Sequence, residues 1–551
     1  MLKLKRMASA ILVAGALMAL SGAAHADNVV ARWIQLGPGS SAAALANGQY
    51  GDQPDSLTPT ILARAIVNDV TQGCPALKVD GALSITMKQR FVASQLTNTP
   101  GSNGAPNGNG ASNNSNKTPN YPQYFVSSAA TSAGNFPDGT AKATTNWGEC
   151  EAVVPAGHST ATIGAVALKL PVANPQRILV IGDIGCRMQN ASQQNCHYAG
   201  PPPGWPFGSL AAYEAEFKPD LIIEVGDWFY RDTSCVVPGV GEFTPGCNDP
   251  TRSNYQTWGD TFDSWNADVF FPGKPLLAAA PWVMARGNHE SCGRGARGWF
   301  ATLDPHPFDI NQVVCALNTG KAAVTNAAVY TADFSPTYAV PAGNTTLLVH
   351  DSSFANDSTV DANMAKNYDY DLTGLLNALP NSRYYVYVTH KPSFGMVTAA
   401  PSNAGDFTEQ FAFSGNATAN SAFRNGVPPQ IALFLAGHIH QFQYLNFNDA
   451  THFAPQLIVG TGGDNLDPPV AADGSLTYKY PTQNPFTVHN SSTTTSTTTT
   501  SVQAAYSQTE FGFAVLDVTS TGFTANVYNI YSTKAGRCAI TLYPRDISCW
   551  D

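Results

Sequence analysis

The stretch Ile431-Ala-Leu-Phe-Leu-Ala-Gly-His-Ile-His440 joins six apolar residues to a pair of histidines, His438 and His440. The chain of 551 residues has only 11 histidines, so a pair two positions apart asks for an explanation. In extended backbone, residues i and i+2 point to the same side, and both imidazoles would then face one object. The stretch is compatible with a polar loop after a buried strand, and also with one part of a metal site.

The same pattern, an apolar run followed by glycine or a polar cluster, recurs on both sides of this stretch. The other runs are rich in Val, Ile and Leu and cover residues 177–181, 220–225, 281–285, 346–349, 384–388 and 456–459. Near-continuous apolar runs of this length are typical of strands buried on both faces. Helix-like stretches lie between them, at residues 208–217 and 361–379. The alternation predicts an α/β fold.

Side chains of metal-ligand type stand where five of these strands end. They are Asp183, Asp227, Tyr230, Asn288, His390, His438 and His440. In open α/β sheets ligands gather at the carboxyl ends of strands, so these side chains can converge although they are far apart in the sequence. Each has a simpler interpretation when taken alone: a turn with a helix cap, a tight Gly-Asn-His turn, or a histidine of the core. Five such endings in this order favour a metal site.

Together the five segments resemble the metallophosphoesterase (calcineurin-like) superfamily, and within it the purple acid phosphatase branch. The superfamily usually has Asp-x-His in its first segment, whereas this chain has Gly185 in place of that histidine. Tyr230, three residues after the second aspartate, replaces it as in the purple branch. Flanking residues 186–187, 205–207, 287–292 and 298–300 also resemble bacterial secreted members of the superfamily.

The resemblance implies a fold of two packed β-sheets flanked by helices, and a centre of two metal ions. The ligands of one ion would be Asp183, Tyr230, His440 and the shared Asp227, and the ligands of the other would be Asn288, His390, His438 and again Asp227. A phenolate and carboxylates suit Fe(III), whereas imidazoles and an amide oxygen suit divalent Fe, Zn or Mn.

The implied activity is that of a secreted phosphatase that hydrolyses phosphate monoesters by attack of a metal-bound hydroxide. Paired metals about 3.5–4 Å apart lower the pKa of a bound water, orient the phosphoryl group and neutralise charge. The metals contribute about +5 and their anionic ligands about −3, so the site would offer a small phosphoester about +2. Two alternatives remain: a phosphodiesterase with the same centre, and a non-catalytic surface-binding protein that has kept the fold.

His289 follows the predicted ligand Asn288 directly. In extended backbone its side chain would face away from that of its neighbour, toward substrate. By resemblance His289 is a catalytic residue that binds the phosphate or assists the leaving group. The alternative is a buried structural histidine.

The general acid of the reaction is left open by the sequence. Plant purple acid phosphatases have further histidines after the segment that corresponds to His390, and residues 391–398 of this chain have none. The candidates to replace them are Lys391, Arg187, Arg297 and His350, each of which could equally be structural. Arg187 and Lys391 are also the candidate substrate-binding residues.

The first 26 residues are typical of a signal peptide. Lys3, Lys5 and Arg6 precede an apolar stretch at residues 8–20, and Ala24-His25-Ala26 fits an A-x-A cleavage pattern. The apolar stretch is too short for an ordinary membrane span, and no later segment qualifies. We therefore expect a secreted or periplasmic protein with no membrane anchor.

Ten cysteines fit an oxidising compartment. Eight of them form four close neighbour pairs, which leaves Cys74 with Cys150. The predicted disulfides are 74–150, 186–196, 235–247, 292–315 and 538–549, although sequence alone allows other connectivities.

The formal net charge is −10 at pH 7, and no run of Lys or Arg is present, which disfavours nucleic acid as a partner. The oligomeric state is left open.

Three parts of the chain are expected. After the signal peptide, an N-terminal β-rich domain covers residues 27–175, with a mobile Asn/Gly/Ser-rich loop at about 97–120. Its strands are predicted at residues 31–35, 60–67, 82–87 and 161–168. The catalytic domain covers residues 176–551, with a Thr/Ser-rich loop at 491–501 and a closing hairpin of residues 512–517 and 523–529.

Overall fold

The structure is a computed structural model. It describes residues 28–96, 144–188, 194–196, 204–232, 259–291, 294–310, 334–353, 362–393, 396–397, 406–407, 427–447, 450–451, 453–468, 477–479, 485–488, 498–531 and 533–550. The predicted signal peptide and the predicted loop at residues 97–120 lie outside this part of the chain. In the described part, no helix combines the length and the apolar character that crossing a membrane requires.

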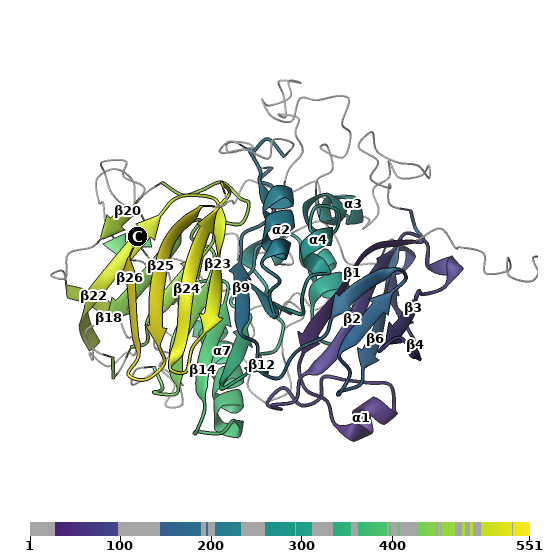
Figure 1. Cartoon of the computed structure of the whole chain (residues 1–551), viewed down its shortest axis with the longest axis horizontal. Coiled ribbons are helices and arrows are strands. Elements are labelled where there is room, and N and C mark those ends of the chain that lie inside the picture. The colour runs from purple at the N-terminus through teal and green to yellow at the C-terminus, as the bar shows by residue number, and fades with distance from the viewer. Residues whose placement is uncertain are drawn as a thin grey trace, which may run out of the picture.

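An 11-stranded sheet runs through the molecule (Figure 1). Its strands, in spatial order, are β26 (Asp546–Trp550), β25 (Lys534–Thr541), β24 (Gly522–Asn529), β23 (Gly512–Val518), β9 (Arg177–Ile181), β10 (Leu221–Glu224), β11 (Trp282–Met284), β1 (Val29–Gly37), β2 (Thr60–Val67), β6 (Gly148–Val154) and β5 (Lys88–Val92). The central strands β9, β10, β11 and β1 are parallel to one another, whereas the neighbours at both ends are antiparallel.

A second large sheet packs against the first. Its strands, in spatial order, are β12 (Tyr338–Ala342), β13 (Thr345–His350), β14 (Tyr384–Thr389), β17 (Ile431–Ala436), β19 (Gln456–Val459), β18 (Phe442–Phe447), β22 (Thr498–Gln508) and β20 (Thr477–Lys479), and β21 (Pro485–Val488) pairs with β22. Strands β13, β14, β17 and β19 are parallel. Both large sheets thus have a parallel centre whose strand carboxyl ends can carry loops to one site.

Two small sheets and the helices complete the described part of the fold. The small sheets contain β4 (Leu83–Thr86), β3 (Ala76–Val79), β7 (Thr160–Ile163) and β8 (Val166–Lys169), and β15 (Met396–Val397) with β16 (Asp406–Phe407). The α-helices of the described residues are α1 (Ala42–Ala46), α2 (Phe207–Glu216), α3 (Phe262–Trp265), α4 (Lys274–Leu277), α5 (Ala296–Gly298) and α7 (Ala362–Ala378).

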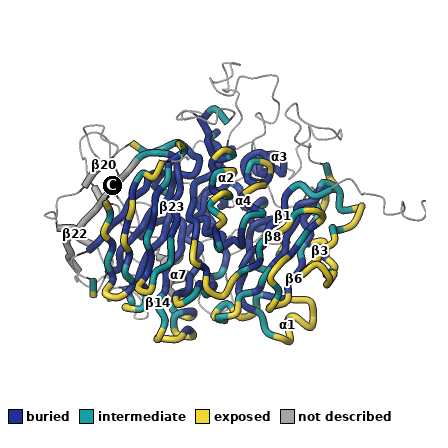
Figure 2. Tube along the Cα trace, viewed as in Figure 1, coloured by how far each residue is buried: buried dark blue, intermediate teal, exposed yellow. Residues whose placement is uncertain are grey.

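The core lies in layers on both faces of each large sheet, and Figure 2 shows the buried residues concentrated along their strands. In β9, Ile178 and Val180 join a cluster shared with Val386 and Leu433 of the second sheet. The alternate residues of β9 face a cluster that contains α2 and α4. Strands buried on both faces explain the near-continuous apolar runs of the sequence. The predicted architecture of two packed sheets flanked by helices is confirmed.

The N-terminal region is rich in strands, as predicted, but four of them extend the first large sheet. Strand β1 pairs in parallel with β11 and carries β2, β6 and β5 beside it. The first large sheet therefore contains strands from both sides of residue 175, and the domain boundary predicted there stays a prediction.

Two of the predicted elements were wrong in detail. Residues 161–168 are not one strand but the hairpin of β7 and β8, which turns at Gly164 with φ 61°. Residues 498–501 of the predicted loop belong to strand β22.

The disulfides Cys74–Cys150, Cys186–Cys196 and Cys538–Cys549 are present as predicted. The last of them joins directly opposite residues of β25 and β26. The four cysteines of the predicted pairs 235–247 and 292–315 lie outside the described residues.

Candidate metal centre

The predicted ligands lie in the loops that follow the parallel strands of both sheets. Asp183 follows β9, Asp227 and Tyr230 follow β10, and Asn288 follows β11, whereas the three histidines follow β14 and β17 of the second sheet. Asp183, Asp227 and His438 have positive φ angles of 58°, 64° and 71°. Non-glycine residues adopt this left-handed region at a cost, and such residues cluster at functional sites.

Three predicted ligands lie on one side of Asp227: Asn288, His390 and His438. We call this the histidine side. The ligand atoms of Asp227, His390 and His438 all lie within 4.8 Å of one another. Nε2 of His390 lies 3.1 Å from Oδ2 of Asp227 and 3.1 Å from Oδ1 of Asn288. Nδ1 of His390 lies 2.9 Å from the carbonyl oxygen of Val225, which orients the ring with Nε2 toward the cluster.

The other predicted ligands meet at the tyrosine side, which consists of Asp183, Tyr230 and His440. The Tyr230 hydroxyl lies 2.9 Å from Oδ1 of Asp183, 2.8 Å from Oδ2 of Asp227 and 3.0 Å from Nε2 of His440. Nε2 of His440 is also 3.2 Å from Oδ1 of Asp183. Asp227 thus touches both sides, in the position of a bridging ligand.

The backbone around Gly185 explains why a tyrosine can reach this point. A Cβ atom at Gly185 would lie 2.9 Å from Cδ2 of Tyr230 and 2.7 Å from the carbonyl oxygen of Trp228. A larger side chain at position 185 and the Tyr230 ring therefore exclude each other. Gly226 has a similar role: its φ is 99°, and a Cβ there would lie 2.6 Å from Nδ1 of His390.

The two histidines of the opening stretch lie on different sides of the cluster, but the extended backbone expected for them was wrong. The backbone at residues 437–440 is not extended, because His438 has a left-handed φ and the amide of Ile439 donates to the carbonyl of Gly437. The bend turns His438 toward His390, with ring centroids 5.1 Å apart, and leaves His440 beside Tyr230.

His289 also departs from the extended geometry that was expected. Residues Asn288–Glu290 form a single helical turn. The amide of His289 donates to Oδ1 of Asp227 at 2.8 Å, and its ring lies over that of Tyr230 with centroids 3.9 Å apart. The imidazole therefore borders the tyrosine side. Burial, together with the charge of Arg294, lowers its pKa.

The donor set fits metal cations. The carboxylates of Asp183 and Asp227 and the Tyr230 hydroxyl are buried together with imidazoles in one cluster. Burial, with the charges of Asp183 and Asp227, raises the pKa of Tyr230. Burial alone would lower the pKa of His440, but Asp464, Asp467 and Asp183 raise it to about 10. The protein therefore creates a strongly negative potential at this point, which bound cations would neutralise.

Residues 176–442 match the family model of the calcineurin-like phosphoesterases. The chain carries a calcineurin-like phosphoesterase domain. This confirms the superfamily resemblance and supports a metal-dependent phosphoesterase, for which the family implies a dinuclear centre.

Several solved structures are similar to the chain at low sequence identity. The purple acid phosphatase PPD1 from seeds of yellow lupin (Lupinus luteus) has 11% identity and a TM-score of 0.47, over 92% of this chain and 74% of its own. PhoD has 9% identity and a TM-score of 0.43, over 94% and 91%. GAP50, the anchor in the inner membrane complex of Plasmodium, has 12% identity and a TM-score of 0.29, over 67% and 89%. A search of the curated proteins found no match.

The other candidate acids and substrate-binding residues have partners within the protein. Arg187 forms an ion pair with Asp464, with Nε 2.8 Å from Oδ1, and Lys391 is buried with its amide donating to Oγ of Ser352. His350 lies in an aromatic cluster with Tyr368 of α7, on the outer face of the second sheet. Burial lowers its pKa to about 4, which favours the structural interpretation.

Arg297, the last candidate acid, lies beside a buried carboxylate. Its amide donates to Oδ2 of Asp260 at 2.7 Å, while Oδ1 of Asp260 accepts from the indole of Trp265. These contacts join α5 to α3 and connect Arg297 to the packing of the helices.

One buried carboxylate that the sequence analysis did not single out, Glu290, supports the backbone of Asp227, the predicted bridging ligand. Oε2 of Glu290 accepts hydrogen bonds from the amides of Asp227 (3.1 Å) and Gly287 (2.9 Å), and Oε1 accepts from Trp228 (2.9 Å) and Phe229 (3.0 Å). Four amide donors suit an ionised carboxylate, which only accepts. Glu290 thus holds the left-handed turn at Asp227 in place. Its position in the segment Gly287-Asn-His-Glu290 was the available signal.

Proposed function

We propose that the protein is a secreted phosphatase that hydrolyses phosphate monoesters at a centre of two metal ions. The observation that carries the proposal is the meeting of the seven predicted ligands at the carboxyl ends of two parallel strand sets, with Asp227 in contact with both sides. When bound, the metals would activate water and neutralise charge on the phosphoryl group. The side chains of the site would bind both ions and position the substrate beside the ions.

We assign Fe(III) to the tyrosine side and a divalent Fe, Zn or Mn ion to the histidine side. The tyrosine side offers a phenol and carboxylates, which suit a hard trivalent ion, and the histidine side offers imidazoles and an amide oxygen. The exclusion between a side chain at position 185 and the Tyr230 ring supports the purple acid phosphatase branch. Colour tests this assignment: iron-loaded wild type should show a visible tyrosinate band, and Tyr230→Phe should lose it.

His289 is the proposed catalytic residue that meets the substrate. Its ring borders the tyrosine side, and its amide is fixed by Asp227, so the imidazole has a defined position beside the metals. A neutral imidazole can donate one hydrogen bond to a phosphate oxygen. His289→Ala should lower kcat/KM while the metal content stays at the wild-type value.

The proposed secretion is supported by the N-terminal sequence pattern and by the three disulfides among the described residues. Fractionation of the native host, with N-terminal sequencing of the mature protein, tests it. A mature protein should begin near Asp27, outside the cytoplasm.

The activity is tested with a nitrophenyl phosphate monoester and a bis-nitrophenyl diester, on protein of measured metal content. The monoester should be the better substrate, and a preference for the diester would instead establish a phosphodiesterase. Asp227→Ala and His438→Ala should each lose more than about 100-fold in kcat/KM, because groups that only orient metal ligands already contribute about 10–100-fold. Equal turnover by wild type and both variants would leave a binding protein without catalysis.

A further inference from the structure

The loop that follows β19, residues 460–467, surrounds the imidazole of His440. Oδ2 of Asp464 lies 3.5 Å from Nε2 of the ring, and the carbonyl oxygen of Asn465 lies 2.7 Å from Nδ1. Oδ2 of Asp467 accepts a hydrogen bond from the backbone amide of His440 at 2.8 Å. The loop thus fixes both the ring and the backbone of one predicted ligand. It is a further strand ending of the same kind as the five that the sequence analysis used.

The same loop also forms hydrogen bonds with the segment that carries Asp183, another residue of the tyrosine side. The amide of Asp464 donates to the carbonyl of Asp183 at 2.8 Å, and the amide of Gly462 donates to the carbonyl of Gly182 at 2.9 Å. Asp464 itself is fully buried. Its carboxylate therefore lies between two predicted ligands, Asp183 and His440, at a place where a buried anion needs a partner.

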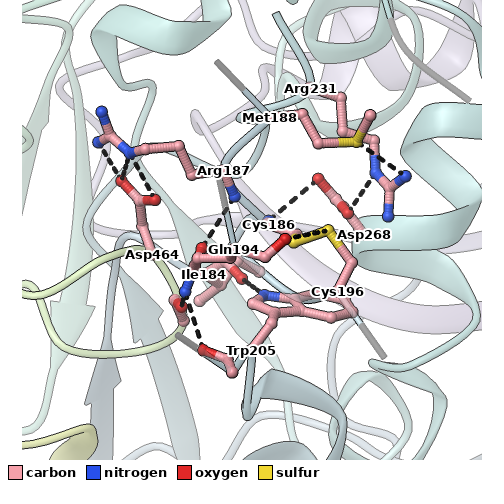
Figure 3. The surroundings of a disulfide bond; sticks show 12 residues. Ile184, Cys186, Arg187, Met188, Gln194, Cys196, Trp205, Arg231, Asp268 and Asp464 are labelled. Atoms are coloured by element: carbon pink, nitrogen blue, oxygen red, sulfur yellow. Dashed lines mark hydrogen bonds and ion pairs between the residues drawn. A yellow bond between two sulfur atoms is a disulfide. The ribbon is translucent and has the colours of Figure 1, made fainter. Parts of the chain in front are cut away.

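Arg187 is that partner. Its guanidinium binds both oxygens of Asp464 with two nitrogens: Nε lies 2.8 Å from Oδ1, and Nη2 donates to Oδ2. The Cζ atom of Arg187 lies 4.9 Å from the centroid of the Tyr230 ring. Figure 3 shows Arg187 reaching Asp464 from the segment that begins at Cys186. Two planar, paired contacts of this kind define the position of a carboxylate more closely than a single one does.

The backbone that carries Arg187 is fixed as well. Oε1 of Gln194 accepts from the amide of Arg187 at 2.8 Å, and Nε2 of Gln194 donates to the carbonyl of Gly463 at 2.8 Å. The disulfide Cys186–Cys196 joins the two segments beside these bonds (Figure 3). Arg187 and the loop of Asp464 therefore belong to one connected unit.

We propose that Asp464 is a positioning residue for the metal of the tyrosine side, and that Arg187 acts on this carboxylate rather than on substrate. The inference rests on the proposed function, because it requires a metal between Asp183, Tyr230 and His440. Asp464 adds negative charge at that point and restrains His440, while Arg187 keeps the carboxylate in one orientation. Neither residue belongs to the ligand set predicted from the sequence.

The test compares Asp464→Asn with Glu151→Gln, a matched variant that removes the charge of a largely buried carboxylate in an arginine ion pair. Glu151 lies in β6, which three strands separate from β10 in the first large sheet. Metal affinity is measured by competition with a chelator, and the visible spectrum is recorded on iron-loaded protein. Asp464→Asn should bind the tyrosine-side metal about 10–100-fold more weakly and shift or lose the visible band. Glu151→Gln should keep the wild-type affinity and spectrum.

Equal metal affinity and spectrum in wild type and Asp464→Asn would overturn the role of Asp464. Arg187→Gln separates the two roles of the arginine: weaker metal binding is expected, whereas a higher KM with unchanged metal affinity would show substrate binding instead. Wild-type protein that binds fewer than two metal ions would contradict the proposed function itself. Metal analysis of the wild type, made before any variant is measured, distinguishes this outcome from a failure of the inference on Asp464.

Discussion

Two clusters of buried charges lie in this molecule, and they are neutralised in different ways. One, the arginine cluster, consists of Arg64, Arg90, Glu149 and Glu151 in the N-terminal strands β2, β5 and β6. The other is the metal centre. Both exclude solvent, so both must compensate charge locally, since an isolated ion in the protein interior is strongly unfavourable.

The arginine cluster compensates its charge with its own side chains. Oε2 of Glu151 lies 2.8 Å from Nη2 of Arg64 and 3.1 Å from Nη1 of Arg90. Arg90 also donates to the carbonyls of Phe300, Ala301 and His306, which joins the N-terminal strands to the segment after α5. Two cations thus stand beside two acids.

The metal centre does not balance in this way. Of its three buried carboxylates, those of Asp183, Asp227 and Asp464, only Asp464 forms an ion pair with an arginine among the described residues, namely Arg187. The remaining neighbours are imidazoles and a phenol. The comparison teaches that a buried acidic cluster without matching arginines is organised for cations that come from outside the chain.

The strongest test of this difference is the removal of metal. Dialysis against a chelator should abolish phosphatase activity, and it should lower the apparent stability by about 3 kcal/mol for metals present at 100-fold their Kd. Refilling with iron and zinc should restore both. Denaturation curves and metal analysis measure the effect. Activity that persists in protein shown to be free of metal would remove the basis of the comparison.

The second test weakens the support of the bridging ligand without touching the ligand itself. In Glu290→Gln, one of the two carboxylate oxygens becomes an NH₂ group that faces two amide donors. We expect a loss of about 10–100-fold in metal affinity. Measurement of both bound ions by competition with a chelator tests this. Wild-type affinity in a folded variant would show that the turn at Asp227 does not depend on Glu290.

Some features of the fold and of the site could be predicted from the sequence, and others could not. The convergence of the candidate ligands was predictable, because each follows an apolar run and strand carboxyl ends meet at one edge. The bend at His438 was not, since a left-handed φ at a histidine leaves no mark in the residue pattern. The pairing of β1 with β11 was equally hidden, because it joins strands about 250 residues apart, and apolar alternation does not name a partner.

The third test disturbs the arginine cluster. Glu151→Gln leaves Arg64 and Arg90 with less negative charge nearby, and because Glu151 is partly exposed the expected loss is about 1–3 kcal/mol of unfolding free energy. Chemical denaturation measures it. Turnover per folded molecule and metal content should not change. A loss of metal in this variant would show that the two clusters are coupled.

The last test concerns Glu149, the less well paired acid of the arginine cluster, whose effect depends on pH. Its Oε1 lies 3.4 Å from Nε of Arg64, but within the described part of the chain neither of its oxygens accepts a hydrogen bond. Burial raises its pKa from the ordinary value of 4.5 to about 8. Between these two pH values the folded protein keeps the proton and the unfolded chain releases it, so the stabilisation from this group is complete below about pH 4.5 and is lost as the pH rises to about 8.

Glutamine imitates the protonated acid at every pH. Glu149→Gln should therefore lie close to wild type near pH 5 and exceed it at pH 8 by a few kcal/mol, since each unit of raised pKa corresponds to about 1.4 kcal/mol. Denaturant unfolding of both proteins at pH 5, 6.5 and 8 gives the difference, in which titration of the metal centre cancels because both proteins share it. A difference that does not change with pH would mean that Glu149 is ionised in the folded protein. The arginine cluster would then hold two carboxylates against two arginines, and the contrast with the metal centre would be at its sharpest.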